Sequence, residues 1–295
     1  MLTLSACSTH QQLSTKTLSP HYSLIQKGQI EYYQFGHGSP IILIAGYATD
    51  VTSWNSEFLA TLAEQHQVIV FNNRNIGKSL VQSSSYENKD LANDTYQLIQ
   101  NLKLKKPAVI GISMGGMIAQ ELAILHPEKL GQLILINTAI AGKDAIHPSP
   151  AVEKKMMNMP ANKLGRYFVA VNLFFPTSCK LKMAYALAAQ RFIPTNYIEI
   201  DPQAIMPQQR QLVMNWIHDD AAAKKIKKLD LPVLILNGES DVVIPPDNSV
   251  ILADTIPNAQ LIRWKQGGHA MIYQFPQQIA NEVDEFITES SSVVE

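Results

Sequence analysis

The sequence predicts an α/β fold with a mostly parallel, eight-stranded sheet flanked by helices. Short apolar, β-branched runs alternate with longer stretches whose apolar residues recur at helical spacing. The runs at 40–45 and 107–112 are continuous rather than alternating, as is typical of strands buried on both faces. Directly after the second run, Gly111-Ile112-Ser113-Met114-Gly115 leads into a helical pattern. This pattern predicts a serine on a sharp strand-to-helix turn.

The first half of the chain supplies six strands and the helices between them. Apolar alternation on both sides of Lys27-Gly28 predicts a hairpin of two strands. Because the later strands alternate with helices, crossover connections and parallel pairing are expected for them. The hairpin strands are expected at 22–25 and 30–35, the further strands at 40–45, 68–71, 107–112 and 132–136, and the helices at 54–65, 90–104 and from Ser113 to His126.

After the sixth strand the alternation stops, and residues 141–225 are rich in methionine, aromatic residues and proline. We expect this segment to be a helical cap inserted into a core formed by 21–140 and 226–288. The sheet should resume with strands at 231–236 and 260–264, and helices are expected at 248–255 and 275–288. Residues 1–20 and 289–295 are expected to be disordered tails.

Composition excludes several classes of protein. The chain has 295 residues, of which 46% are hydrophobic and 17% charged, and its net charge is −1. This balance gives no electrostatic field to attract nucleic acid, and no apolar stretch approaches the ~20 residues of a membrane span. Cys7 and Cys179 have neither disulfide-framework nor metal-ligand spacing. No metal or cofactor is therefore expected.

The N-terminal residues allow two interpretations. Leu4-Ser5-Ala6-Cys7 resembles the lipobox of bacterial lipoproteins, and the polar residues 8–19 resemble a tether. This resemblance implies lipid on Cys7, membrane attachment and a place in the cell envelope. Only six residues precede Cys7, without lysine or arginine, so a signal peptide would need residues upstream. The alternative is a cytoplasmic protein with a disordered N-terminus.

A nucleophilic serine needs a base to take its proton and an acid to orient that base. Asp241 follows the strand at 231–236, and His269 follows the strand at 260–264 in a Gly267-Gly268-His269 loop. With Ser113, both residues lie at the carboxyl ends of parallel strands, where open α/β sheets form their crevice. Glu239 is an alternative acid. Asn137, at the end of the preceding strand, is uncharged and is excluded from that role.

These motifs together resemble the α/β-hydrolase fold superfamily over residues 22–289. The matching pieces are 111–116, 238–245 and 267–270. The resemblance implies that Ser113 is the nucleophile, His269 the general base and then acid, and Asp241 the residue that holds the imidazole. It also assigns the oxyanion hole to the backbone N–H groups of Met114 and Tyr47.

Two motifs depart from the family pattern. The family has His-Gly where this chain has Ala45-Gly46, which keeps the backbone donor but removes the bracing histidine. The family's Asp-x-Arg-Gly-x-Gly-x-Ser turn differs here at two positions, in Asn72-Asn73-Arg74-Asn75-Ile76-Gly77-Lys78-Ser79. We interpret this turn as structural support in which Arg74 forms an ion pair or binds a carbonyl.

The predicted activity is hydrolysis of a carboxylic ester, thioester or lactone of a small, largely apolar substrate through an acyl-enzyme. The cap would shape the substrate pocket and exclude water from it. Two alternatives use the same triad, namely hydrolysis of a carbon–carbon bond and acyl transfer to an acceptor other than water. A third alternative, from another class, is a non-catalytic ligand-binding protein with this fold.

Overall fold

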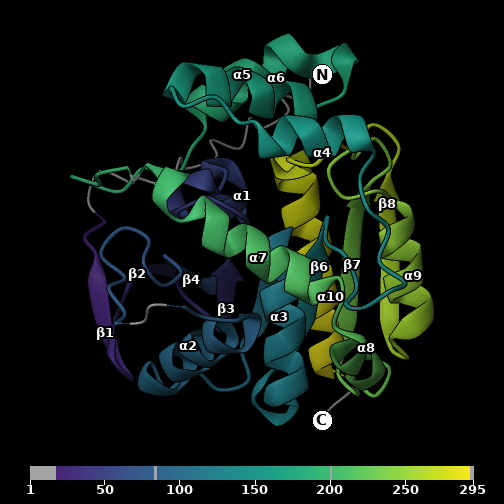
Figure 1. Cartoon of the computed structure of the whole chain (residues 1–295). Coiled ribbons are helices and arrows are strands. Elements are labelled where there is room, and N and C mark those ends of the chain that lie inside the picture. Colours follow the sequence, from purple (N-terminus) through teal and green to yellow (C-terminus); the bar gives the residue numbers. More distant parts are fainter. Residues whose placement is uncertain (1–17, 83–84, 200, 293–295) are drawn as a thin grey trace, which may run out of the picture.

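A central sheet of eight strands runs through the computed structural model, which describes residues 18–82, 85–199 and 201–292 (Figure 1). The strand order is β1-β2-β4-β3-β5-β6-β7-β8. The strands are β1 (His21–Ile25), β2 (Gly28–Gly36), β3 (Ser39–Ile44), β4 (His66–Phe71), β5 (Ala108–Ile112), β6 (Leu133–Ile136), β7 (Val233–Gly238) and β8 (Ala259–Trp264).

Pairing within the sheet confirms the mostly parallel α/β class. The hairpin β1–β2 is antiparallel, and β2 joins β4 in antiparallel register, whereas all pairs among the strands β3 to β8 are parallel. Every residue of β6 and β7 is buried, as the continuous apolar runs predict for strands covered on both faces. The carboxyl ends of β3 and β5 to β8 consequently meet along one edge of the sheet, where the loops that carry polar side chains begin.

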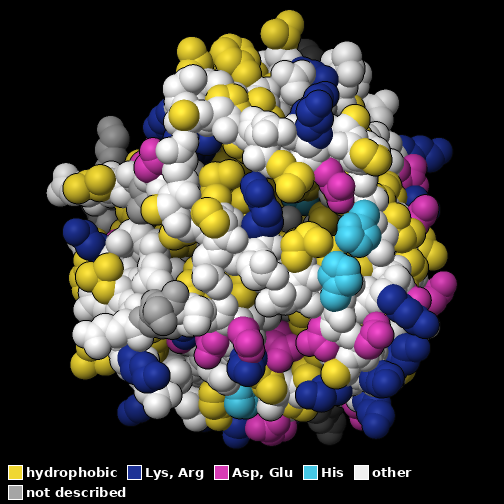
Figure 2. Space-filling view, in the orientation of Figure 1, with side chains coloured by type: hydrophobic (Ala, Val, Ile, Leu, Met, Phe, Trp, Pro, Cys, Tyr) yellow, Lys and Arg dark blue, Asp and Glu magenta, His cyan; other side chains and the backbone are white. Residues whose placement is uncertain are grey.

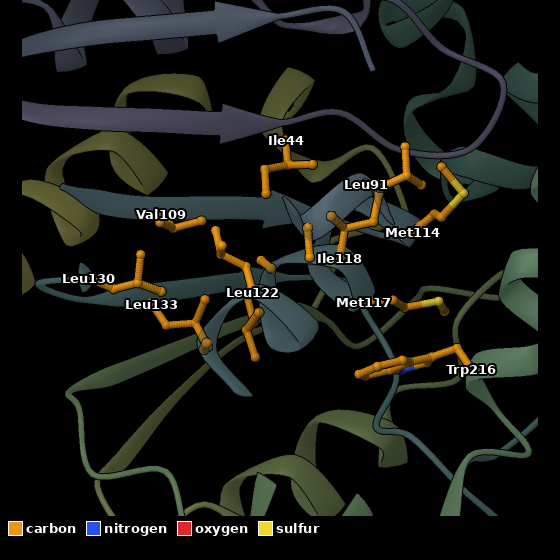
Figure 3. Packing of buried hydrophobic residues seen from close by; sticks show 14 of the residues in the cluster. Ile44, Leu91, Val109, Met114, Met117, Ile118, Leu122, Leu130, Leu133 and Trp216 are labelled. Carbon is orange, nitrogen blue, oxygen red and sulfur yellow. The ribbon is translucent and has the colours of Figure 1, made fainter. Parts of the chain in front are cut away.

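Helices cover both faces of the sheet. Helices α2 (Asn88–Asn101), α3 (Met114–Leu125), α8 (Asp220–Ile226) and α9 (Asp247–Thr255) contribute to the core on one face. Helices α1 (Ser56–Leu62) and α10 (Pro276–Ser292) contribute to the core on the other face. Figure 3 shows Ile118 and Leu122 of α3 packed over Val109 and Leu133 of β5 and β6. This packing places α3, and the turn that precedes it, at the centre of the molecule.

The segment between β6 and β7 is helical, as predicted for the cap. It contains α4 (Pro150–Met157), α5 (Lys163–Phe174), α6 (Lys180–Ala189), α7 (Met206–Trp216) and α8. In Figure 1, α5 and α6 lie beyond the end of the sheet, and α7 crosses in front of it. Trp216 of α7 is buried in the same core as α3, and its indole N–H donates to Ala139 O at 3.2 Å. One helix of this insertion is therefore anchored in the core beneath it.

Two predicted boundaries are corrected by the structure. Helix α10 continues to Ser292, so residues 289–292, expected to be a disordered tail, are helical. The hydroxyls of Ser290 and Ser291 bond back to the carbonyls of Phe286 and Ile287, one turn earlier in the same helix. The helix expected at 54–65 begins only at Ser56, because the Asn55 side chain accepts the N–H groups of residues 57 and 58 as a cap.

The N-terminal prediction is not tested by the structure. Cys7 lies outside the described residues, and its lipidation stays a prediction. Within the described ranges, no helix has both the length and the apolar character needed to cross a membrane.

Candidate active site

Ser113 occupies the sharp turn between β5 and α3. Its backbone has φ 55° and ψ −122°, a conformation that residues other than glycine rarely adopt. A Cβ on Gly111 would lie 2.4 Å from Gly115 O, and a Cβ on Gly115 would lie 2.1 Å from Ile44 O. The two glycines are therefore required by the close approach of strand and helix, and the hydroxyl is held at the end of the sheet.

Ser113, His269 and Asp241 form one continuous hydrogen-bonded chain, as the sequence predicts. His269 Nε2 lies 3.1 Å from Ser113 Oγ, and His269 Nδ1 lies 2.8 Å from Asp241 Oδ2. With an ionised Asp241, Nδ1 carries the ring proton and Nε2 is free to accept the serine proton. His269 is 7% exposed and Asp241 3% exposed, so the base and the acid are shielded from water.

The Asp241 carboxylate is oriented by its own loop. Its Oδ1 accepts the backbone N–H groups of Val243 at 2.8 Å and Ile244 at 2.9 Å, which leaves Oδ2 for the imidazole. The alternative acid, Glu239, is exposed and lies 3.6 Å from Arg263 Nε. The structure therefore brings Asp241, and not Glu239, to the histidine.

Asn137 connects the strand ends that carry the acid and the base. Its Nδ2 donates to Gly268 O at 3.0 Å and His269 O at 2.8 Å. Its Oδ1 accepts from Gly238 N at 2.9 Å and from Asn237 Nδ2 at 3.2 Å. Asn137 is 1% exposed and has φ 45°. The sequence excluded it as an acid but carried no signal for this structural role, which depends on residues far away in the chain.

The loop after β3 passes directly against the serine turn. A Cβ on Gly46 would lie 3.5 Å from Ser113 Cβ, which places the neighbouring Tyr47 beside the nucleophile. Met114, the first residue of α3, directly follows the serine and is buried. The Tyr47 hydroxyl donates to Met206 O of α7 at 3.2 Å. Burial raises the pKa of Tyr47, and the nearby Arg210 guanidinium partly opposes that shift.

The turn after β4 provides structural support, as interpreted from the sequence. Arg74 forms a buried bidentate pair with Asp94, with Nε–Oδ2 at 2.6 Å and Nη2–Oδ1 at 2.7 Å. Asn72 accepts the Val51 N–H at 2.9 Å and donates to Glu31 Oε2 at 2.8 Å. The turn thereby braces the loop after β3, and Arg74 is occupied by an ion pair.

A cavity of about 260 Å³ lies in the cap; the carbonyl of Met206, one of its lining residues, accepts the Tyr47 hydroxyl, but no residue of the triad lines it. Figure 2 shows a hollow on this face, between α4 and α7, that is edged by hydrophobic and basic side chains. The lining residues are Met157, Met159, Pro160, Arg166, Gln203, Met206, Pro207 and Arg210. Sequence reasoning expected some cap residues to face a pocket but did not identify which ones. No cluster of potential metal ligands occurs in the part of the chain that the structure describes.

Comparison with known proteins agrees with this fold. The model of the alpha/beta hydrolase fold family matches residues 39–276. The 2-hydroxymuconate semialdehyde hydrolase of Pseudomonas sp. (strain CF600) is 27% identical over 270 residues, which are 87% of this chain and 89% of that protein.

Solved structures show the same fold. An alpha/beta hydrolase fold protein from Chitinophaga pinensis superposes with a TM-score of 0.80 at 20% identity, over 92% of this chain and 98% of that chain. A thermophilic esterase from Thermogutta terrifontis has a TM-score of 0.73 at 22% identity, over 93% of this chain and 99% of that chain.

Proposed function

This chain belongs to the α/β-hydrolase fold family and is an enzyme of that family, and we propose that it is a serine hydrolase of carboxylic esters, thioesters or lactones. The proposal rests on one observation above all. A half-buried serine hydroxyl lies 3.1 Å from a buried imidazole, which in turn lies 2.8 Å from a carboxylate. That arrangement supplies a nucleophile, its base and the orienting acid.

Ser113 Oγ would attack the substrate carbonyl while its proton passes to His269 Nε2. The Ser113–carbonyl bond forms as the carbonyl π electrons move to oxygen. When the C–O or C–S bond then breaks, the imidazolium returns the proton to the leaving group and an acyl-enzyme remains. Water, deprotonated by the same nitrogen, attacks the acyl group and releases the acid together with free Ser113.

The developing oxyanion would be stabilised by the backbone N–H groups of Met114 and Tyr47. Met114 is the first residue of α3, so the helix dipole also favours negative charge at this place. Removal of one such donor typically costs about 2.7–4 kcal/mol of transition-state stabilisation. The position of the Tyr47 loop therefore matters almost as much as the triad.

The cap cavity supports a small and largely apolar substrate. Methionine side chains line much of it, and its volume of about 260 Å³ fits a short acyl chain or a small ring. Its polar part comes chiefly from Arg166 and Arg210. Arg166 contacts the carbonyls of residues 160 and 161 and lies 3.4 Å from Asp201, so it is already partnered.

The likeness to 2-hydroxymuconate semialdehyde hydrolase favours a second candidate on the same triad, hydrolysis of a carbon–carbon bond. Both reactions begin with the same groups and differ in the bond that breaks. Assays with chromogenic esters of graded acyl length, beside a vinylogous 1,5-diketone, distinguish them. Turnover of the diketone at rates above those of every ester would assign the second activity.

The proposal is tested by labelling with a fluorophosphonate probe. We expect the wild-type protein to be labelled and Ser113→Ala to remain unlabelled, because the probe reacts with an activated serine. Ser290→Ala is the matched control, since it removes a serine hydroxyl that only donates to Phe286 O on α10. Absence of serine-dependent labelling in folded protein would refute the hydrolase proposal and favour a non-catalytic ligand-binding role.

A further inference from the structure

We propose that Gln209 of α7 is a positioning residue that holds the oxyanion loop, residues 46–50, in its active geometry. The cap would then supply part of the catalytic machinery in addition to the substrate pocket. This inference rests on the proposed function, in which the Tyr47 N–H stabilises the oxyanion.

The first observation is a short hydrogen bond between the cap and this loop. The backbone N–H of Ala48 donates to Gln209 Oε1 at 2.6 Å. Ala48 directly follows Tyr47 and has φ 55°, a left-handed conformation that is unfavourable for alanine. Because a strained peptide unit persists only where its surroundings hold it, the bond from Gln209 is well placed to keep the loop in this conformation.

The second observation is the environment of the Gln209 amide. Its side chain is fully buried, at 0% exposure, and its only hydrogen bond within the described residues is the one to Ala48. The oxygen must face Ala48, because a backbone N–H can only donate. The Nε2 group is left without a partner in the described structure. A buried amide with an unused donor is costly, so a role at the loop explains why a glutamine stands here.

The third observation is that other residues of α7 besides Gln209 contact the loop and that the helix is itself tied to the core. Met206, whose carbonyl accepts the Tyr47 hydroxyl at 3.2 Å, lies three residues before Gln209 and so on the same face of the helix. Elsewhere on α7, Gln208 Nε2 donates to Tyr86 O at 3.0 Å, and Leu212 O accepts from Asn88 Nδ2 at 3.1 Å. The helix is thus a fixed support between the core and the loop.

The consequence concerns the transition state and not the bound substrate. The Tyr47 N–H contacts the oxyanion, which develops only as Ser113 attacks, so a misplaced loop weakens transition-state binding selectively. Loss of the Gln209 contact should therefore lower kcat while KM changes little. Affinity for a transition-state analogue should fall by the same factor as kcat/KM.

The test compares two neighbouring glutamines of α7. In Gln209→Leu we expect kcat for a p-nitrophenyl ester to fall by about 10- to 100-fold, below the effect of deleting a whole oxyanion donor. The inhibition constant of a trifluoromethyl ketone of the same acyl length should rise by that factor. Gln208→Leu, which removes a contact to Tyr86 but none to the loop, should change neither quantity.

Three results would overturn the inference: wild-type kcat and ketone affinity in Gln209→Leu, an equal loss in Gln208→Leu, or a loss confined to KM. If Gln209→Leu does not fold, Gln209→Asn takes its place, because that amide is one methylene too short to reach Ala48. Failure of the proposed function is recognised separately, since the wild-type protein would then turn over no ester at all, or its turnover would survive in Ser113→Ala. Turnover that depends on Ser113 but not on Gln209 would refute this inference alone.

Discussion

Asp241→Asn is the sharpest test of the triad, because the substitution preserves shape and changes only the pattern of donors and acceptors. In the wild-type structure, Asp241 Oδ1 accepts two backbone N–H groups, at 2.8 and 2.9 Å, while Oδ2 lies 2.8 Å from His269 Nδ1. The two N–H donors require an acceptor, so the amide oxygen of the variant takes the place of Oδ1. The new NH2 group then faces the imidazole.

This change reverses the tautomer of His269. With a donor opposite Nδ1, that nitrogen must accept, and the ring proton moves to Nε2, which lies 3.1 Å from Ser113 Oγ. A protonated Nε2 cannot take the serine proton. We expect kcat to fall by about 10⁴-fold, as for the corresponding change in a serine protease. At 1.36 kcal/mol for each factor of ten, that is about 5.4 kcal/mol of barrier.

The assay is the initial rate on a chromogenic ester at neutral pH, with the thermal unfolding midpoint as a check on folding. Glu239→Gln is the matched control, because that carboxylate follows the same strand but is exposed and lies near Arg263. It should retain wild-type kcat. A folded Asp241→Asn variant within tenfold of wild type would refute the reasoning, as would an equal loss in Glu239→Gln.

Two further predictions concern the residues that shape the site. Gly115→Ala should lower the free energy of unfolding by about 3 kcal/mol in a denaturant titration, because its Cβ would lie 2.1 Å from Ile44 O. An unchanged unfolding midpoint would contradict the view that the close approach of α3 to β3 requires glycine here. Asn137→Ala leaves the buried carbonyls of Gly268 and His269 without their donor, so stability should fall by about 1–3 kcal/mol. Its kcat should fall as well, and unaltered kinetics in that variant would show that the His269 loop holds its position without the amide.

The sheet and the serine turn were predictable because their causes are local in sequence. A strand buried on both faces must be apolar throughout, and this produces the runs that mark β3, β5 and β6. Glycine is needed at 111 and 115 because a Cβ there would lie only 2.4 and 2.1 Å from backbone oxygens. The serine turn can therefore be recognised from five consecutive residues. The order of Asp241 and His269 after their strands followed from the same alternation.

The ends of helices were less predictable, since they depend on single hydrogen bonds. Asn55, which caps α1, was a readable signal that apolar periodicity alone overlooked. Helix α10 instead continues to Ser292 through a serine-rich stretch, in which two hydroxyls bond back to the preceding turn. Serine is common both in tails and at such positions, so composition could not distinguish the two outcomes.

By itself, the sequence determined the α/β class, the helical insertion after the sixth strand and the three residues that meet as a candidate triad. Only the tertiary structure decided between Asp241 and Glu239, and only it revealed the contacts of Asn137 and Gln209. The physical reason is distance along the chain. Asn137 holds a carbonyl 132 residues away, and Gln209 holds a backbone N–H 161 residues away. Such contacts leave no periodic pattern, because either partner would look the same in a sequence where the other was absent.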